Sequence, residues 1–160
     1  MEKITKTNAM RLLDAAGLEY TGYEYDTSDG KIDGISVAHK VGMPEEIVYK
    51  TLVAQGTSHE HYVFVIPVAA ELDLKKAARA AKEKSIEMIA VKEILPLTGY
   101  IRGGCSPIGM KKPYPTFIEE EAMLYQSIVF SGGKIGSQIQ MSPEALAEFI
   151  GAEYAPLTKA

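Results

Sequence analysis

The stretch from residue 47 to residue 67 reads IVYKTLVAQGTSHEHYVFVIP. Its two ends, residues 47–54 and 61–67, are rich in β-branched and aromatic residues, a composition that is typical of strands. The polar segment GTSHEH between them predicts a turn. We therefore expect two antiparallel strands, joined as a hairpin, near the middle of the chain.

Helices and further strands are predicted on both sides of this hairpin. Thr7 is a suitable cap for a helix over residues 8–16, and Ser142 with Pro143 begins a last helix that stops at Gly151. The remaining predicted elements are helices over residues 36–41 and 73–84, strands over residues 20–25, 86–90, 116–119, 127–131 and 134–141, a turn ending near Pro96, and a glycine-rich loop over residues 99–109.

The order of these elements indicates the fold class. Strands and helices do not alternate regularly, as they would in a doubly wound parallel sheet. No linker, repeat or change of composition divides the chain. We predict one α/β (α+β) domain over residues 1–160, with a mixed, mostly antiparallel sheet or barrel.

Composition excludes several classes of protein. The chain has 160 residues, of which 46% are hydrophobic and 24% charged, so disordered, fibrous and membrane proteins are disfavoured. The first residues, MEKITKTNAMRLLDAAG, lack the apolar core of a secretory signal, and we expect a cytoplasmic protein with no membrane partner. The single cysteine and three scattered histidines predict neither an internal disulfide nor a metal site, and we expect no cofactor.

Net charge limits the partners. At −4 the chain lacks the basic surface with which a protein holds nucleic acid by itself, so we expect no DNA binding and only weak binding to free RNA. Two basic clusters could still contact one end of an RNA: Lys111 with Lys112, or Lys75 with Lys76 and Arg79. Solvated lysines of a helix or loop are the simpler interpretation of each cluster.

Lys50 lies in the first of three segments that could carry chemistry, residues 48–53 (VYKTLV). Strand alternation places it on the same face as Val48 and Leu52. A lysine in apolar company either faces a pocket or extends its ammonium to the sheet edge, and both interpretations stay open.

The other two segments are rich in glycine. In residues 99–109 (GYIRGGCSPIG), paired glycines followed by a proline could direct backbone N–H groups toward one point, as in an oxyanion hole, or form a simple tight turn. Residues 131–137 (SGGKIGS) lack the spacing of a phosphate-binding loop and predict a hairpin turn that lets a ligand come close. Cys105 could be a nucleophile only by virtue of its loop position.

The motifs VYKTLVA, ELDLKKAA, TGYIRGGCSPIG with the lysine pair that follows it, and SGGK occur in one order along the chain. Together they resemble the YbaK family, which is related to the editing domain of bacterial prolyl-tRNA synthetases. The resemblance runs from the first helix to the last strand. It implies a compact domain with a curved, mostly antiparallel sheet or barrel wrapped by helices.

The resemblance also implies an activity. Proteins of this family hydrolyse the ester of Cys-tRNA(Pro), and here Cys-tRNA(Cys) is a further candidate substrate, with the substrate thiol assisting the reaction. The implied partners are the aminoacylated 3′ end of a mischarged tRNA and prolyl-tRNA synthetase. Two alternatives stay open: an Ala-tRNA(Pro) deacylase that uses an activated water, and a non-catalytic module that binds a synthetase or tRNA.

The residues implied by the resemblance fall into two groups. The catalytic group is Lys50, Gly103 and Gly104, and the substrate-binding group is Tyr25, Thr51, Ser131, Gly132 and Gly133. Two positions depart from the family pattern. Cys105 stands where an apolar residue is usual, which argues against a nucleophile, and Gln138 stands where some relatives carry an aspartate.

Overall fold

The predicted hairpin is the centre of the fold in the computed structural model, which describes residues 4–159. Strands β2 (Tyr49–Gly56) and β3 (His61–Pro67) pair antiparallel. In their register Lys50 lies opposite Ile66, and Leu52 lies opposite Phe64. β3 is buried almost throughout, as expected for a central strand of valine, isoleucine and aromatic residues.

Three strands extend this hairpin into a five-stranded sheet with the order β4-β2-β3-β5-β8. β4 (Ile86–Met88) is antiparallel to β2, whereas β5 (Thr116–Glu119) and β8 (Glu153–Ala155) continue the other side in parallel. A second, antiparallel sheet has the order β1-β7-β6, with β1 (Thr21–Glu24), β7 (Ser137–Met141) and β6 (Ile128–Ser131).

One parallel bridge, between Val48 and Val129, joins the two sheets. Since four of the strand pairs described are antiparallel and two are parallel, the predicted mixed and mostly antiparallel arrangement is confirmed. The strands of residues 4–159 form two sheets rather than a closed barrel.

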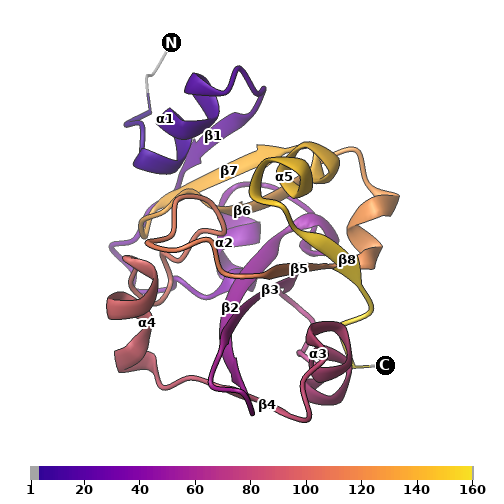
Figure 1. Cartoon of the computed structure of the whole chain (residues 1–160). Coiled ribbons are helices and arrows are strands. Elements are labelled where there is room, and N and C mark those ends of the chain that lie inside the picture. The colour runs from indigo at the N-terminus through magenta and orange to yellow at the C-terminus, as the bar shows by residue number, and fades with distance from the viewer. Residues whose placement is uncertain (1–3, 160) are drawn as a thin grey trace.

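Five α-helices and two short 3₁₀ turns in residues 4–159 surround the sheets (Figure 1). Thr7 and Ser142 cap the first and last helices through their hydroxyls, at 3.2 Å in both cases, as the sequence predicts. The helices are α1 (Asn8–Ala15), α2 (Gly34–Lys40), α3 (Leu74–Ala81), α4 (Val91–Thr98) and α5 (Pro143–Ile150), and the turns are η1 (Glu45–Ile47) and η2 (Glu120–Leu124). None of the helices described has the length and apolar character to cross a membrane.

The predicted turn ending near Pro96 is wrong, because Pro96 lies inside α4. The helix begins where Glu93 accepts a hydrogen bond from the Ala90 amide at 2.9 Å, and it ends at Gly99 with φ +85°. A proline removes one backbone donor, and a short exposed helix tolerates that loss when both of its ends are fixed. The strand β8 and the turn η2 were not predicted, because elements of three to five residues give no periodic signal.

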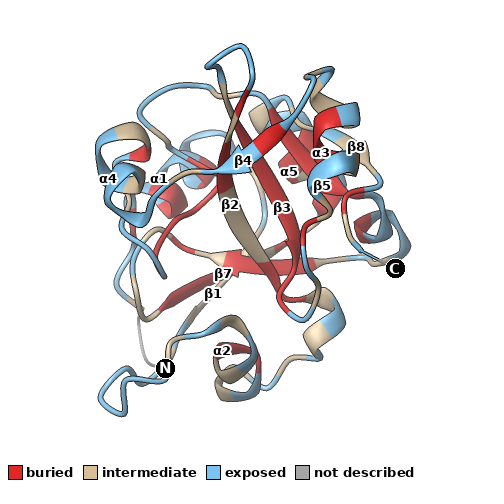
Figure 2. Cartoon of the chain, turned by 90° about the horizontal axis from the view of Figure 1, so that it is seen from below, coloured by how far each residue is buried: buried red, intermediate tan, exposed pale blue. Residues whose placement is uncertain are grey.

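Two apolar cores lie on the two faces of the five-stranded sheet. The larger core joins that sheet to α1, α5 and the second sheet, and the smaller core lies beneath α3. Figure 2 shows buried residues concentrated in the strands while the helices turn exposed faces outward. Because side chains alternate along β2, Tyr49 enters the larger core and Leu52 packs against the smaller one.

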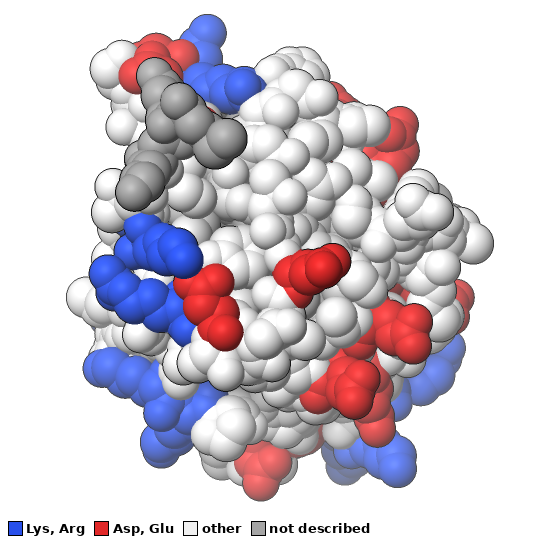
Figure 3. Space-filling model, turned by 90° about the horizontal axis from the view of Figure 1, so that it is seen from above, with Lys and Arg blue, Asp and Glu red and all other residues white. Residues whose placement is uncertain are grey.

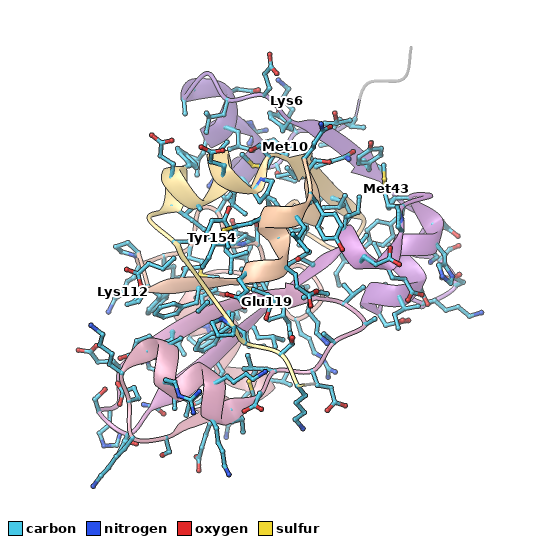
Figure 4. The ribbon with its side chains drawn as sticks, turned by 90° about the vertical axis from the view of Figure 1, so that its right-hand side faces the viewer. Lys6, Met10, Met43, Lys112, Glu119 and Tyr154 are labelled. Atoms are coloured by element: carbon cyan, nitrogen blue, oxygen red, sulfur yellow. The ribbon has the colours of Figure 1, made fainter. Side chains whose placement is uncertain are left out.

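A buried carboxylate fixes the end of the chain against the sheet. Glu119, at the end of β5, is 3% exposed and accepts hydrogen bonds from the Leu157 amide at 2.9 Å and from the Thr158 amide at 3.2 Å. Its other oxygen accepts from the Glu121 amide at 2.8 Å. Figure 4 shows Glu119 inside the molecule, beneath the last strand. These bonds satisfy a charge that would be costly to bury alone.

Candidate active site

A cavity of about 780 Å³ opens where the two sheets separate. The strands β2 and β6 are adjacent at Val48 and Val129, but β6 ends at Ser131 and the chain then turns away through Gly136, whose φ is +98°. The cavity is lined by residues from four parts of the chain: Tyr25 to Val37, Val48 to Leu52 with Val68, Arg102 to Cys105, and Ser131 with Gln138.

One edge of β2 is open toward this cavity. The Val68 amide, just after β3, donates to the Val48 carbonyl at 2.8 Å, so Val48 directs its carbonyl toward the β3 side. In an antiparallel pair, only every second residue bonds to the partner strand. Tyr49 and Thr51 therefore direct their backbone groups away from β3. Since β4 pairs with β2 only from Ala54 to Gly56, and β6 bridges it only at Val48, no strand of residues 4–159 pairs with the edge at Thr51. Its main-chain groups are available to a ligand.

Lys50 is half-buried in the cavity wall, as its place beside Val48 and Leu52 allows. Within residues 4–159 its ammonium group has no ion pair and no hydrogen bond to the protein. Burial lowers the pKa of Lys50 below its usual 10.5, and the charge of Glu71 opposes this effect. An uncompensated ammonium in a cavity favours an anion or a polarised oxygen as its ligand.

Two hydroxyl groups in the cavity wall also lack partners. Tyr25 Oη and Thr51 Oγ1 are buried and make no hydrogen bond within the described residues. Buried polar atoms in proteins are nearly always paired, with protein or with water. These two predicted substrate-binding residues therefore offer polar groups that a ligand could satisfy.

The glycine-rich loop reaches the cavity through Gly103 and Cys105. The Gly104 amide donates to the Ile101 carbonyl at 3.0 Å, whereas the amides of Gly103 and Cys105 make no hydrogen bond within residues 4–159. Gly103 has φ +86°, a conformation that favours glycine. The backbone donors that this loop can offer to a ligand therefore include those on either side of Gly104.

Gly104 holds this loop against the second glycine segment. A Cβ atom at this position would lie 3.0 Å from both the Lys134 Cα and the Ile135 backbone nitrogen. Backbone atoms cannot move aside as the end of a side chain can. The residue at position 104 thus sets how closely the two loops approach.

Of the second segment, Ser131 lines the cavity, whereas Gly132 and Gly133 form the turn behind it. The Gly132 amide donates to the Ser137 carbonyl at 2.9 Å, and the Gly133 amide donates to Ser131 Oγ at 3.1 Å. Gly133 has φ +107°. The structure thus brings Ser131 to the cavity and gives the two glycines a shaping position.

A lysine that the sequence did not single out fixes the opposite wall. The Lys40 ammonium donates to the Asp26 carbonyl at 2.6 Å, to Asp29 Oδ1 at 2.7 Å and to the Lys31 carbonyl at 2.8 Å. It also lies 5.9 Å from the centre of the Tyr25 ring. These contacts hold the loop before α2, which carries several cavity residues, in one conformation.

Other cavity residues were not among the predicted site residues, for different reasons. Asp33 caps α2 by accepting a hydrogen bond from the Ser36 amide at 3.1 Å, and its spacing to Ser36 was a visible signal. Arg102 lies inside a motif that was selected for its glycines. Gln138 is buried at the cavity wall, and its side-chain amide donates to the Ser137 carbonyl at 3.2 Å.

The thiol of Cys105 is in an environment that disfavours nucleophilic chemistry. It is 8% exposed, and burial raises the pKa of Cys105 to about 11. A nucleophilic cysteine reacts as the thiolate, which a neighbouring positive charge normally stabilises. At neutral pH this thiol stays protonated.

We expect that Cys105→Ser and Cys105→Ala each keep deacylase activity within about threefold of the parent, because a buried protonated thiol is a structural group. Initial rates with mischarged tRNA at equal concentrations of folded protein measure this. If both variants fold and lose a thousandfold or more, as on removal of a nucleophile, Cys105 carries the chemistry.

No group of three or more His, Cys, Asp and Glu side chains in residues 4–159 is placed to hold a metal ion. The polar groups of the cavity wall instead include one ammonium, several hydroxyls and free backbone amides, together with the side chains of Asp33, Arg102 and Gln138. Such a set can bind and polarise a carbonyl oxygen.

Comparisons with known proteins agree with this arrangement. The model of the aminoacyl-tRNA editing domain matches residues 34–149. EbsC of Enterococcus faecalis, named as a candidate Cys-tRNA(Pro)/Cys-tRNA(Cys) deacylase, is 44% identical over 153 residues, which are 96% of this chain and 93% of EbsC.

Solved structures share the fold. A candidate trans-editing enzyme for prolyl tRNA synthetase is 25% identical with a TM-score of 0.81, over 98% of this chain and 100% of that one. The hypothetical protein APE2540 is 21% identical with a TM-score of 0.85, over 93% and 97% of the two chains, and supports the fold alone. The predicted resemblance is confirmed: this chain belongs to the aminoacyl-tRNA editing domain family.

Proposed function

We propose that this protein is a trans-editing deacylase that hydrolyses the ester of Cys-tRNA(Pro), with Cys-tRNA(Cys) as a second substrate. The observation that carries the proposal is the unpaired Lys50 ammonium in a cavity that also exposes the free amides of Gly103 and Cys105. The 44% identical relative, named for this activity, supports the choice of substrate.

In this proposal the catalytic groups act on the ester carbonyl. Lys50 and the Gly103–Gly104 loop stabilise the negative charge that develops on the carbonyl oxygen. Tyr25, Thr51 and Ser131 contact the aminoacyl end, while Gly132 and Gly133 keep the wall close enough for that contact. An aminoacyl ester is already activated, so positioning and charge stabilisation suffice.

The substrate thiol supplies the nucleophile. Its sulfur forms a bond to the ester carbon of the same cysteine, the bond from that carbon to the ribose oxygen breaks, and the ribose oxygen takes up a proton. Water then opens the resulting thiolactone to free cysteine. This chemistry selects cysteine over alanine, a distinction for which pocket size alone is worth only about 1–3 kcal/mol.

The proposal extends to partners and place. The editing domain spans residues 1–160, beyond the matched residues 34–149, because the similarity to EbsC covers 96% of the chain. The enzyme works in the cytoplasm and receives mischarged tRNA beside prolyl-tRNA synthetase. Its net charge of −4 favours delivery by a synthetase over strong capture of free tRNA.

The test compares three substrates at equal concentration: Cys-tRNA(Pro), Ala-tRNA(Pro) and Cys-tRNA(Pro) methylated on sulfur. We expect hydrolysis of the first and at least about a hundredfold slower hydrolysis of the others, since neither has a free thiol. Faster hydrolysis of Ala-tRNA(Pro) would indicate an activated water instead. No turnover of any substrate would indicate a non-catalytic module.

A further inference from the structure

Two loops beside the cavity carry positive charge and no negative charge. Residues 99–112 contain three basic residues, residues 131–136 contain a fourth, and neither segment has an Asp or Glu. The whole chain, by contrast, has a net charge of −4. We call these four residues the basic rim: Arg102, Lys111, Lys112 and Lys134.

Packing between the loops places Arg102 and Lys134 beside the cavity, while Lys111 and Lys112 follow at the far end of the first loop. Arg102 lines the cavity, and the backbone of Lys134 is in close contact with Gly104. A Cβ atom on Gly133 would lie 3.2 Å from the Tyr100 ring. The Lys111 amide donates to the Thr98 carbonyl at 3.1 Å, which anchors the far end of the first loop to α4.

The basic rim has no ionic partners within residues 4–159, and its one side-chain hydrogen bond there is a long one, from the Lys111 ammonium to the Pro96 carbonyl at 3.4 Å. All four side chains are exposed. Lys112 lies at the periphery of the molecule in Figure 4. Such unpaired cations at the surface attract anions along the approach to the cavity.

The opposite wall of the cavity has the opposite character. Its loop carries Asp26, Asp29 and Asp33 against one lysine of its own, Lys31, and Lys40, which bonds to this loop, is engaged in holding it. Charge is also uneven over the surface at large: Figure 3 shows several Lys and Arg along the left edge of one face, others at its lower right, and most Asp and Glu toward its right. The cavity is thus approached favourably by a polyanion from one side.

We propose that the basic rim binds phosphates of the tRNA acceptor arm and guides its aminoacylated 3′ end into the cavity. This inference rests on the proposed function, because it takes the tRNA ester as the substrate of the cavity. Phosphate contacts position a nucleic acid without reading its sequence. A few such contacts fit the weak, salt-sensitive binding expected of an acidic protein.

A second basic cluster, on α3, provides the control. Lys75 and Arg79 are exposed on this helix and Lys84 is exposed just after it, while Lys76 donates to the Thr158 carbonyl at 2.7 Å. No residue of α3 lines the cavity. Figure 1 shows α3 and α4 on opposite sides of the five-stranded sheet. The α3 cluster thus matches the rim in charge but not in position.

The experiment compares two triple variants with equal loss of charge. The rim variant is Lys111→Gln, Lys112→Gln and Lys134→Gln, and the α3 variant is Lys75→Gln, Arg79→Gln and Lys84→Gln. Arg102 is left intact because it lines the cavity. Binding of a tRNA(Pro) acceptor minihelix that carries no amino acid is measured by fluorescence anisotropy over a range of salt concentrations. Hydrolysis is measured with Cys-tRNA(Pro) and with the cysteine ester of adenosine, which has no phosphate.

We expect the rim variant to bind the minihelix about tenfold more weakly at low salt, with a salt slope reduced by about 2 for three lost contacts. Its kcat/KM should fall similarly with Cys-tRNA(Pro) and stay at the parent value with the adenosine ester. The α3 variant should match the parent in all three measurements.

Several results would overturn the inference. Equal loss in both variants would indicate a general charge effect, and parent-like RNA binding by the rim variant would remove the site. Loss with the adenosine ester would indicate a distorted cavity. A rim variant that keeps RNA binding but no longer responds to prolyl-tRNA synthetase would assign the rim to a protein partner. If the parent hydrolyses neither ester, the proposed function fails, while selective loss of minihelix binding would still support an RNA site.

Discussion

Replacing Lys50 with alanine should lower kcat/KM for Cys-tRNA(Pro) by about a hundredfold or more, the scale of losing one positioned electrostatic group. The ammonium is half-buried in the cavity wall and has no ion pair or hydrogen bond within residues 4–159, so its charge is available to the substrate. Arginine should restore little activity, because its planar fork is larger and directs its donors differently.

Loss of the Lys50 ammonium, in Lys50→Ala or in Lys50→Met, should leave the fold intact. Burial lowers the pKa of Lys50, which means that the folded state disfavours the ammonium. Lys50→Met keeps most of the apolar stem without the charge, so its midpoint of thermal unfolding at neutral pH should equal or exceed that of the parent.

The pH dependence of that difference has a definite sign. A lysine whose pKa is lower in the folded state destabilises the fold fully below that lowered pKa, and the penalty disappears as pH rises toward the unfolded value of 10.5. The stability advantage of Lys50→Met should therefore shrink as pH rises through this window. A Lys50→Ala protein that folds normally and deacylates at the parent rate would remove Lys50 from the site.

Local chemistry explains what the sequence could predict. The hairpin of β2 and β3 follows from β-branched residues on either side of a polar turn, and the caps of α1 and α5 follow from Thr7 and Ser142. Alternation places Lys50 on the face of Val48 and Leu52 once that strand is assigned, but it does not decide between a pocket and the sheet edge. Each of these features depends on residues that are close in sequence.

Features that depend on distant contacts were not predictable. The strand β8 forms only because β5 offers an edge, and Glu119 then bonds to the segment that follows it. Lys40 is an ordinary helix-end lysine until the chain places three acceptors around it. The turn that the loop adopts also determines that the Gly104 amide is bonded and the Gly103 amide is free. Two neighbouring glycines in the sequence do not specify that turn.

Gly104→Ala tests whether contact between the two glycine loops sets the geometry of the cavity. The added methyl group would lie 3.0 Å from the backbone of Lys134 and Ile135, so the loops must separate by a few tenths of an ångström or more. Overpacking of this kind costs about 1–3 kcal/mol of stability. Catalysis should suffer more, because a displacement of about 1 Å in a positioned group can cost a hundredfold in rate.

The loss in Gly104→Ala cannot come from a missing donor, since alanine keeps the amide that bonds to Ile101. Gly151→Ala is the matched control: its φ of +68° makes any side chain strained, but no atom lies within 4 Å of the added carbon and the residue is outside the cavity. It should lose stability and keep the parent kcat/KM per folded molecule. We expect Gly104→Ala to lower kcat/KM about ten- to a hundredfold per folded molecule, a loss that Gly151→Ala should not share. Parent-like kinetics for Gly104→Ala would mean that the two loops adjust freely. The free amides of Gly103 and Cys105 would then lack the rigid support that charge stabilisation requires.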